Sequence, residues 1–239
     1  AMLPATWALL PYLESIAQAQ RASDITLNSP LAALAYVIIG IWGLAVYSHI
    51  KGFTSNVRLL SLVGTEDWVE PFLGQVLEPD HDLVQREAEF TTVVKHRFVE
   101  PLKDDKELSK LFSVNYIDAR HPDASMQRDI CSRLAAVIAD YDVVMVMDFG
   151  HGVMGQAVRA LVQERAKFLA LNCQTNSNNH GYNIIDRQYQ RADSFSLDER
   201  EICLACGQRA PDFAVELEKL RVKMGARCAW LTRGGTETI

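Results

Sequence analysis

The chain has 239 residues, 49% hydrophobic and 23% charged, and its 24 Lys and Arg against 30 Asp and Glu give a formal net charge of -6. This composition excludes intrinsic disorder, which needs low hydrophobicity with high net charge, and a fibrous chain, which needs far more than 13 Gly and 8 Pro. The acidic balance argues against electrostatic binding to nucleic acid or to an anionic membrane. The five cysteines are irregularly spaced, which indicates reduced thiols in a cytoplasmic protein.

The first elements are predicted to be helical. Apolar residues recur at helical spacing over residues 3–20, which predicts an amphipathic helix. Leu31–Tyr47 (LAALAYVIIGIWGLAVY) is almost wholly apolar and is long enough to be a membrane-span candidate. It is not N-terminal with a basic leader, and its flanks show no clear Lys/Arg bias. We therefore favour a buried core helix, in which Gly40 and Gly43 allow close packing, over a membrane span.

A buried strand is predicted next. The apolar run 56–64 (NVRLLSLVG) is typical of a strand inside a sheet, and Gly64 is expected to end it. Thr65 is expected to cap a short helix that begins at Glu66.

A pair of strands is predicted in the middle of the chain. Residues 91–99 (TTVVKHRFV) are rich in β-branched side chains, and their alternation places Lys95 and Arg97 on one side of a half-exposed strand. Residues 112–117 predict a second short strand. We interpret the region of about 85–120 as a small lid or accessory sheet.

Helices and strands alternate from residue 122 onwards. A continuous apolar run such as 142–147 (DVVMVM) is typical of a parallel strand covered on both faces. The predicted strands are 142–147, 167–173, 194–197 and 227–232, and the predicted helices begin at 122–124 or span 153–166, 199–206 and 211–224. This alternation predicts an α/β fold with a doubly wound, mainly parallel sheet flanked by helices, which we take as a single domain over 1–239.

Ligands in such sheets bind beyond the carboxyl ends of the strands, and polar turns follow these strands. Asp148 and the glycines of the turn DFGHG offer a carboxylate and backbone N–H groups at a helix N-terminus, which suits an anion or a metal-bound phosphate. The alternative is a tight turn in which Asp148 caps the helix. Asn172 precedes the run 174–183 (QTNSNNHGYN), which is either a surface loop or the lining of a polar pocket.

Two further turns follow the last predicted strands. Asp198 and Glu201 are three residues apart on the first turn of a helix, where carboxylates can hold Mg²⁺ through water or can simply suit the helix dipole. Thr232 and Gly234 belong to a glycine-containing turn that fits a phosphate. Together the four turns predict a site for a nucleotide and a phosphorylated or polyol substrate, bridged by Mg²⁺.

Several of these segments resemble one enzyme family. The turn DFGHGV at 148–153 resembles the Asp-Tyr-Gly-Lys-Gly segment of sugar kinases of the ribokinase (PfkB) family, especially the heptose-phosphate kinase domain of ADP-heptose synthases. Asp198 and Glu201 fall where that family has an Asn-x-x-Glu motif associated with Mg²⁺ and phosphate. Thr232-x-Gly234 is similar to its Thr-x-Gly nucleotide turn.

The resemblance continues upstream, since residues 91–95 are similar to the strand beside the sugar site and residues 48–67 to the family's early helix, loop and strand. It implies a ribokinase-like fold and a sugar or sugar-phosphate kinase, in which ATP donates its γ-phosphoryl group to a sugar hydroxyl with Mg²⁺ as cofactor. The implied partners are a nucleotide and a sugar or sugar-phosphate substrate, and we leave a homodimer open.

The resemblance assigns roles to particular residues. The nucleotide would meet Asn172, Thr232 and Gly234, and Mg²⁺ would be organised by Asp198 and Glu201. The substrate would be met by residues of the predicted strand and of the first turn, namely Lys95, Arg97, Gly150, His151 and Gly152. Asp148 is the nearest candidate for the catalytic base by position.

The sequence also departs from the family pattern. The family's Gly-Gly pair is Ile41-Trp42 here, and its following Asn is Ser48. The Gly-Ala-Gly-Asp motif, which supplies the family's anion hole and base, does not occur in the 239 residues, and the opening strand is not recognisable in residues 1–24. These departures support an alternative, namely an inactive or truncated relative, incomplete at its C-terminus, that serves as a binding or assembly module.

Overall fold

The computed structural model describes residues 33–37, 56–75, 77, 83–101, 108–117, 122–175, 181–234 and 237–239, with the backbone alone at 33–37, 95–101, 108–110 and 113. In these ranges the chain forms an α/β fold with one seven-stranded sheet and two two-stranded sheets. The predicted α/β class is therefore confirmed. The predicted helix over 3–20 lies outside the described residues.

The main sheet has the strand order β11-β10-β9-β8-β7-β1-β2. All neighbouring strands pair in parallel except β10 and β11, which are antiparallel, so the sheet is mixed. The strands are β1 (Ala33–Val37), β2 (Val57–Leu60), β7 (Val143–Asp148), β8 (Leu169–Cys173), β9 (Ser194–Asp198), β10 (Cys228–Arg233) and β11 (Glu237–Thr238). The predicted strands at 142–147, 167–173, 194–197 and 227–232 are all found.

The prediction of a core helix at 31–47 is wrong for residues 33–37. These residues form β1, which lies between β2 and β7 and pairs in parallel with both. A continuous apolar run fits a buried helix and a buried parallel strand equally well, because neither shows a polar face. The rest of the 31–47 segment lies outside the described residues. None of the helices in the described ranges has the length and hydropathy of a membrane span.

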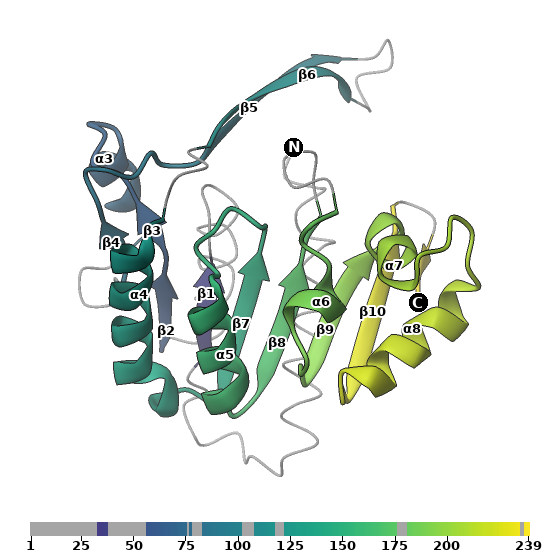
Figure 1. Cartoon of the computed structure of the whole chain (residues 1–239). Helices are drawn as coiled ribbons and strands as arrows, with labels where there is room; N and C mark the ends of the chain where they lie inside the picture. The colour runs from purple at the N-terminus through teal and green to yellow at the C-terminus, as the bar shows by residue number, and fades with distance from the viewer. Residues whose placement is uncertain are drawn as a thin grey trace.

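Helices on one side of the sheet are seen in front of the strands in Figure 1. They include α4 (Ala124–Val137), α5 (Gln156–Arg165) and α8 (Phe213–Lys223), and the remaining helical segments are α3 (Val69–Leu73), η2 (Ile138–Asp140), α6 (Ile185–Gln188) and α7 (Glu199–Cys206). Asp123 caps α4 by accepting hydrogen bonds from the backbone N–H of Ser125 (2.8 Å) and Met126 (2.9 Å), which explains why the helix begins there. The doubly wound arrangement stays a prediction.

Apolar side chains are buried on both faces of the sheet. Along β7, Val144 and Val146 belong to the larger core cluster with residues of α4 and α5, while Met145 and Met147 belong to a second cluster with β2 and α3. Successive strand residues point to opposite faces, so a strand with both faces covered must be apolar throughout. This explains the run DVVMVM.

The middle of the chain forms two small sheets. β3 (Leu62–Val63) pairs in parallel with β4 (Gln85–Arg86), and β5 (Val94–Pro101) pairs antiparallel with β6 (Leu108–Tyr116). The β5–β6 ribbon projects beyond the main sheet in Figure 1. The predicted strands of this region are therefore present, and the role of the ribbon as a lid stays a prediction.

The predicted cap of the short helix is wrong. α3 begins at Val69, and its N-cap residue is Trp68, which makes no side-chain cap hydrogen bond. Glu66, where the helix was predicted to begin, lies before it and bonds to Thr92. Its carboxylate accepts hydrogen bonds from the backbone N–H (2.8 Å) and the hydroxyl (2.6 Å) of Thr92. The Thr92 hydroxyl in turn accepts a hydrogen bond from the N–H of Gly64 (2.7 Å). These contacts tie the end of β3 to the start of the ribbon.

We expect the substitution Gly64→Ala to destabilise the fold by about 1–3 kcal/mol, because the site is already filled. A Cβ atom at this position would lie 2.4 Å from the carbonyl oxygen of Phe90 and 2.4 Å from a carboxylate oxygen of Glu66. Gly74→Ala is the matched control, since Gly74 has helical backbone angles and its Cβ would meet only Glu70 O at 3.3 Å. Urea unfolding followed by circular dichroism measures both; equal stability of the two variants would contradict the expectation.

Candidate functional site

The predicted site residues of the main sheet lie at one edge. The arrowheads of β7, β8 and β9 point to this edge in Figure 1, and β10 runs parallel to β9. Asp148 is the last residue of β7 and Asn172 the penultimate residue of β8. Asn172 pairs with Ser196 of β9, and Thr232 of β10 pairs with Asp198. Four turns that are distant in sequence therefore meet along the carboxyl ends of four neighbouring strands.

Asp148 is the centre of a buried polar network. Its side chain is 2% exposed, and its Oδ2 accepts hydrogen bonds from Arg159 Nη2 (2.8 Å) and Nε (3.0 Å) and from the Tyr189 hydroxyl (2.8 Å). Its Oδ1 accepts from the N–H of Gly150 (2.8 Å) and from Asn183 Nδ2 (3.3 Å). Both carboxylate oxygens are therefore already engaged, as expected of a structural ion pair.

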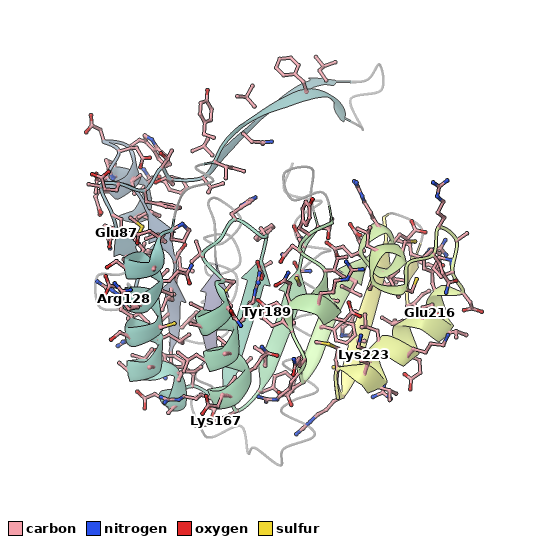
Figure 2. All side chains as sticks on the ribbon, viewed as in Figure 1. Glu87, Arg128, Lys167, Tyr189, Glu216 and Lys223 are labelled. Carbon is pink, nitrogen blue, oxygen red and sulfur yellow. The ribbon has the colours of Figure 1, made fainter. Side chains whose placement is uncertain are left out.

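The partners of Asp148 join the strand to three other segments. Arg159 comes from α5, and its Nη2 also donates to Asn183 Oδ1 (3.0 Å), while its Nη1 donates to Gln188 at the end of α6. Tyr189, labelled in Figure 2, is fully buried beneath the guanidinium, whose carbon is 5.5 Å from the ring centre. Burial, and then the charge of Asp148, raise the pKa of Tyr189 well above its usual range, so its hydroxyl stays a donor.

The glycine turn after β7 is held by its own backbone and by α4. Gly150 and Gly152 have φ values of 69° and 93°, in a backbone region that residues other than glycine rarely adopt. His151 is buried, and its ring stacks on Phe149 with centroids 6.4 Å apart. Gln127 of α4 donates from Nε2 to the carbonyls of Gly152 (2.5 Å) and the next residue (3.2 Å). The turn therefore presents mainly backbone to its surroundings.

Asn172 offers an acceptor at the same edge. Its side chain is 7% exposed, and its Nδ2 donates to the carbonyl and the hydroxyl of Ser196, both at 3.2 Å. Its Oδ1 is buried without a hydrogen-bond partner in the described part of the chain. A buried amide oxygen without a partner is costly, so this atom is suited to accept a hydrogen bond from a ligand or water.

Asp198 and Glu201 form a capping box at the start of α7. Asp198 Oδ1 accepts from the N–H of Glu201 (2.8 Å), and Glu201 Oε2 accepts from the N–H of Asp198 (2.9 Å). The other oxygen of Glu201 accepts from the N–H of Thr175 after β8 (3.0 Å). Such reciprocal bonds satisfy helix N–H groups that have no partner inside the helix.

The burial of Glu201 and its contacts also change the pKa of its carboxyl group. Burial, and then the charge of Asp198, raise the pKa of Glu201 from 4.5 to about 8, although the two backbone hydrogen bonds oppose the rise. Both of its oxygens are used by backbone N–H groups, so Glu201 does not fit direct coordination of Mg²⁺. Asp198 is exposed and uses only one oxygen in the cap, so its carboxylate suits an ion bound through water. The described residues contain no group of three or more His, Cys, Asp or Glu side chains that could hold a metal ion.

The structure describes the turn after β10 as far as Gly234. The Thr232 hydroxyl donates to the carbonyl of Leu197 near the end of β9 (3.3 Å). Gly234 has a φ of 57°, and no described residue lies within 4 Å of a Cβ atom placed there. Arg233, between them, donates from Nε to Glu199 (2.9 Å) and lies over the ring of Phe213 at 4.6 Å. A ligand could therefore approach the backbone at Gly234 closely.

A cavity lies where the ribbon leaves the body of the protein. Its volume is about 490 Å³, and its lining includes Glu66, Trp68, Thr92 and Tyr116. Partial burial would raise the pKa of Glu66, but the hydrogen bonds from Thr92 outweigh it and lower that pKa. The side chains of the predicted substrate residues on β5, at positions 95 and 97, lie outside the described ones.

Sequence reasoning missed the residues that surround the predicted ones. Arg159 and Tyr189, the partners of Asp148, lie in segments with no motif around them. Glu66 and Trp68, which line the cavity beside the ribbon, follow the predicted strand 56–64, and no motif in the sequence marks them.

Solved structures share this fold. A protein assigned as a phosphofructokinase from Staphylococcus aureus superposes with a TM-score of 0.58 at 11% identity, over 87% of this chain and 73% of its own. One assigned as a sugar kinase from Clostridium perfringens gives 0.58 at 6% identity, over 88% and 72%. The nucleoside kinase of Burkholderia thailandensis in complex with inosine gives 0.53 at 12%, over 87% and 72%. No protein-family model matches the sequence, and a search of curated proteins finds no match. The chain has the fold of sugar and nucleoside kinases.

Proposed function

We propose that this chain is a carbohydrate-kinase-like domain that binds ATP at the carboxyl edge of its main sheet and a sugar or sugar phosphate beneath the ribbon. The observation that carries the proposal is the meeting of the four turns at one edge, in a fold shared with sugar and nucleoside kinases. The nucleoside kinase of Burkholderia thailandensis has also been solved in complex with ADP-inosine, which supports nucleotide binding by this fold.

The nucleotide end of the site would be formed by β8, β9 and β10. Thr232 and Gly234 would meet the phosphates through backbone and hydroxyl groups, and Asn172 Oδ1 would accept a hydrogen bond deeper in the site. Mg²⁺ would arrive with ATP and neutralise phosphate charge. Asp198 would meet it through water, with Glu201 holding the helix end in place.

The substrate end would be formed by the glycine turn after β7 and the ribbon. Gly150 and Gly152 would offer backbone, His151 would support the turn from below, and Lys95 and Arg97 would meet a substrate phosphate. Aromatic rings and a carboxylate in the 490 Å³ cavity suit a polyol. The resemblance of the turn 148–153 to ADP-heptose synthases makes a heptose phosphate the first substrate to test. We place the protein in the cytoplasm, where ATP is available, and propose that it forms a homodimer.

A second candidate function is binding without phosphoryl transfer. The observation that favours it is the engagement of both Asp148 oxygens by Arg159, Tyr189 and their neighbours, because a base must be reachable by the substrate hydroxyl. In this case the domain would bind the nucleotide and serve as a binding or assembly module.

Two measurements separate these functions. Isothermal titration with Mg–ATP tests nucleotide binding, and a coupled assay of ADP formation with sugars, nucleosides and heptose phosphates tests transfer. Binding with ADP formation supports the kinase, and binding without ADP formation under any acceptor supports the binding module. Failure of both ATP and ADP to bind at millimolar concentration would overturn the proposal.

We expect Asp198→Asn to bind metal-free ATP about three- to tenfold more tightly than the wild type, because it removes a negative charge beside the triphosphate. Affinity for Mg–ATP should change less, since the ion screens that charge. Asn is also a good N-cap, so α7 should keep its stability. Asp129→Asn, at an exposed position on α4, is the matched control. Equal affinities of Asp198→Asn and wild type for metal-free ATP would place the phosphates elsewhere.

A further inference from the structure

A groove of about 910 Å³ lies beside α7, between the residues that lead into α6 and the start of α8. Its volume is in the range of sites for small molecules. The predicted residues of the sheet edge, Asp148, Asn172, Asp198 and Thr232, are not part of its lining, so it is a separate feature of the surface.

The groove carries unneutralised positive charge. Three exposed arginines line it, Arg187, Arg200 and Arg209, and none has an ion-pair partner for its guanidinium in the described part of the chain. The carboxylate found among its described lining residues, Glu199, is bound by Arg233 at 2.9 Å. In a chain of net charge -6, three unpaired arginines around one hollow are a local reversal of sign.

The position of Arg200 has no structural explanation. It lies in the first turn of α7, where the helix dipole disfavours a positive charge, next to Glu199 and Glu201, which the dipole favours. An anion in the groove would turn this unfavourable position into a favourable one.

The wall of the groove also has an apolar part. Ile184, Leu204 and Phe213 contribute to it, so a ligand with both an anionic and an apolar portion would fit. Gly181 and Gly207 also line the groove, with φ values of 86° and 71°. Any other residue at these two positions would have a strained backbone.

We propose that this groove binds a phosphate-bearing small molecule through Arg187, Arg200 and Arg209. Guanidinium groups pair with phosphate oxygens through two parallel N–H donors, which makes arginine the preferred residue for this ligand class. The phosphates could belong to the same nucleotide that the sheet edge binds, because Arg233 joins Glu199 of the groove to the turn after β10. They could also belong to a second phosphorylated molecule.

The test is isothermal titration of the full chain with inorganic pyrophosphate. The wild type should bind, and the triple variant Arg187→Gln, Arg200→Gln and Arg209→Gln should lose at least about tenfold in affinity. Arg200→Gln alone should lose about threefold or more. Arg128→Gln is the matched control, since Arg128 is exposed on α4, far from α7 in Figure 2, and should bind like the wild type. No binding by the wild type at millimolar concentration, or equal affinity of the triple variant, would overturn the proposal.

A competition experiment identifies the source of the phosphates. If saturating Mg–ATP abolishes pyrophosphate binding and Arg200→Gln weakens ATP, the groove holds the phosphates of the nucleotide. If both ligands bind together, the groove serves a second phosphorylated molecule. Either result supports the site. Pyrophosphate binding without ATP binding would leave this inference standing while the proposed function fails.

Discussion

We expect Asp148→Asn to reduce the free energy of unfolding by about 3–5 kcal/mol, because it leaves the guanidinium of Arg159 largely buried without a counter-charge. The two side chains are 2% and 16% exposed, so water cannot replace the lost partner. Asn keeps only one acceptor oxygen, so the donors on one side of the carboxylate, either Arg159 and Tyr189 or Gly150 and Asn183, would also lose their acceptor. Urea unfolding followed by circular dichroism measures the change, with Asp129→Asn on the surface of α4 as the control.

A double-mutant cycle separates the ion pair from other effects of the substitution. Arg159→Met removes the buried positive charge, so Asp148→Asn should cost about 1–3 kcal/mol less in its presence. Purely additive effects would contradict the ion pair. If Asp148→Asn keeps the stability of the wild type and abolishes ADP formation, the residue is a base and not a structural anchor.

The second large expected effect is a dependence of the unfolding free energy on pH, caused by Glu201. Glu201 has a pKa of about 8 in the folded protein against 4.5 as its ordinary value, so the folded state retains a proton that the unfolded state releases. Its contribution to stability is therefore present in full below about pH 4.5 and is lost as the pH rises towards 8. Because one pKa unit corresponds to about 1.4 kcal/mol, this contribution should fall by roughly 3 kcal/mol between pH 5 and pH 8.

Glu201→Gln tests this directly. Gln keeps the N3 position of the capping box but does not titrate, so the difference in unfolding free energy between wild type and variant should shrink or change sign as the pH rises. Glu164→Gln, at an exposed position on α5, is the control and should give a constant difference. A constant difference for Glu201→Gln would mean that folding does not raise the pKa of Glu201, which would contradict this account.

Most of the fold after residue 122 was predictable because each strand is a short apolar run bounded by polar or glycine residues. β7 is a good example, since 143–148 is observed where 142–147 was predicted. The segment 31–47 failed for the opposite reason. It has no polar boundary or periodicity, so nothing in it distinguishes a buried helix from β1.

The meeting of the strand-end residues was also predictable, since parallel neighbouring strands must end at the same edge. The hydrogen-bond partners of these residues were not predictable. The partners of Asp148 come 11 and 41 residues later, on α5 and after α6, and depend on how these helices pack. Asp198 and Glu201 have the spacing of both a metal pair and a capping box; the hydrogen bonds of the structure show the capping box, and the metal role stays a prediction.

The central claim is that the carboxyl edge of the sheet binds a nucleotide, and hydrogen exchange measured by mass spectrometry with and without Mg–ATP tests it most directly. We expect ATP to slow exchange of the backbone N–H groups in 198–201 and 228–234, with α4 unchanged as the internal reference. Unchanged exchange in both segments under saturating Mg–ATP, or slowing confined to other parts of the chain, would contradict the claim.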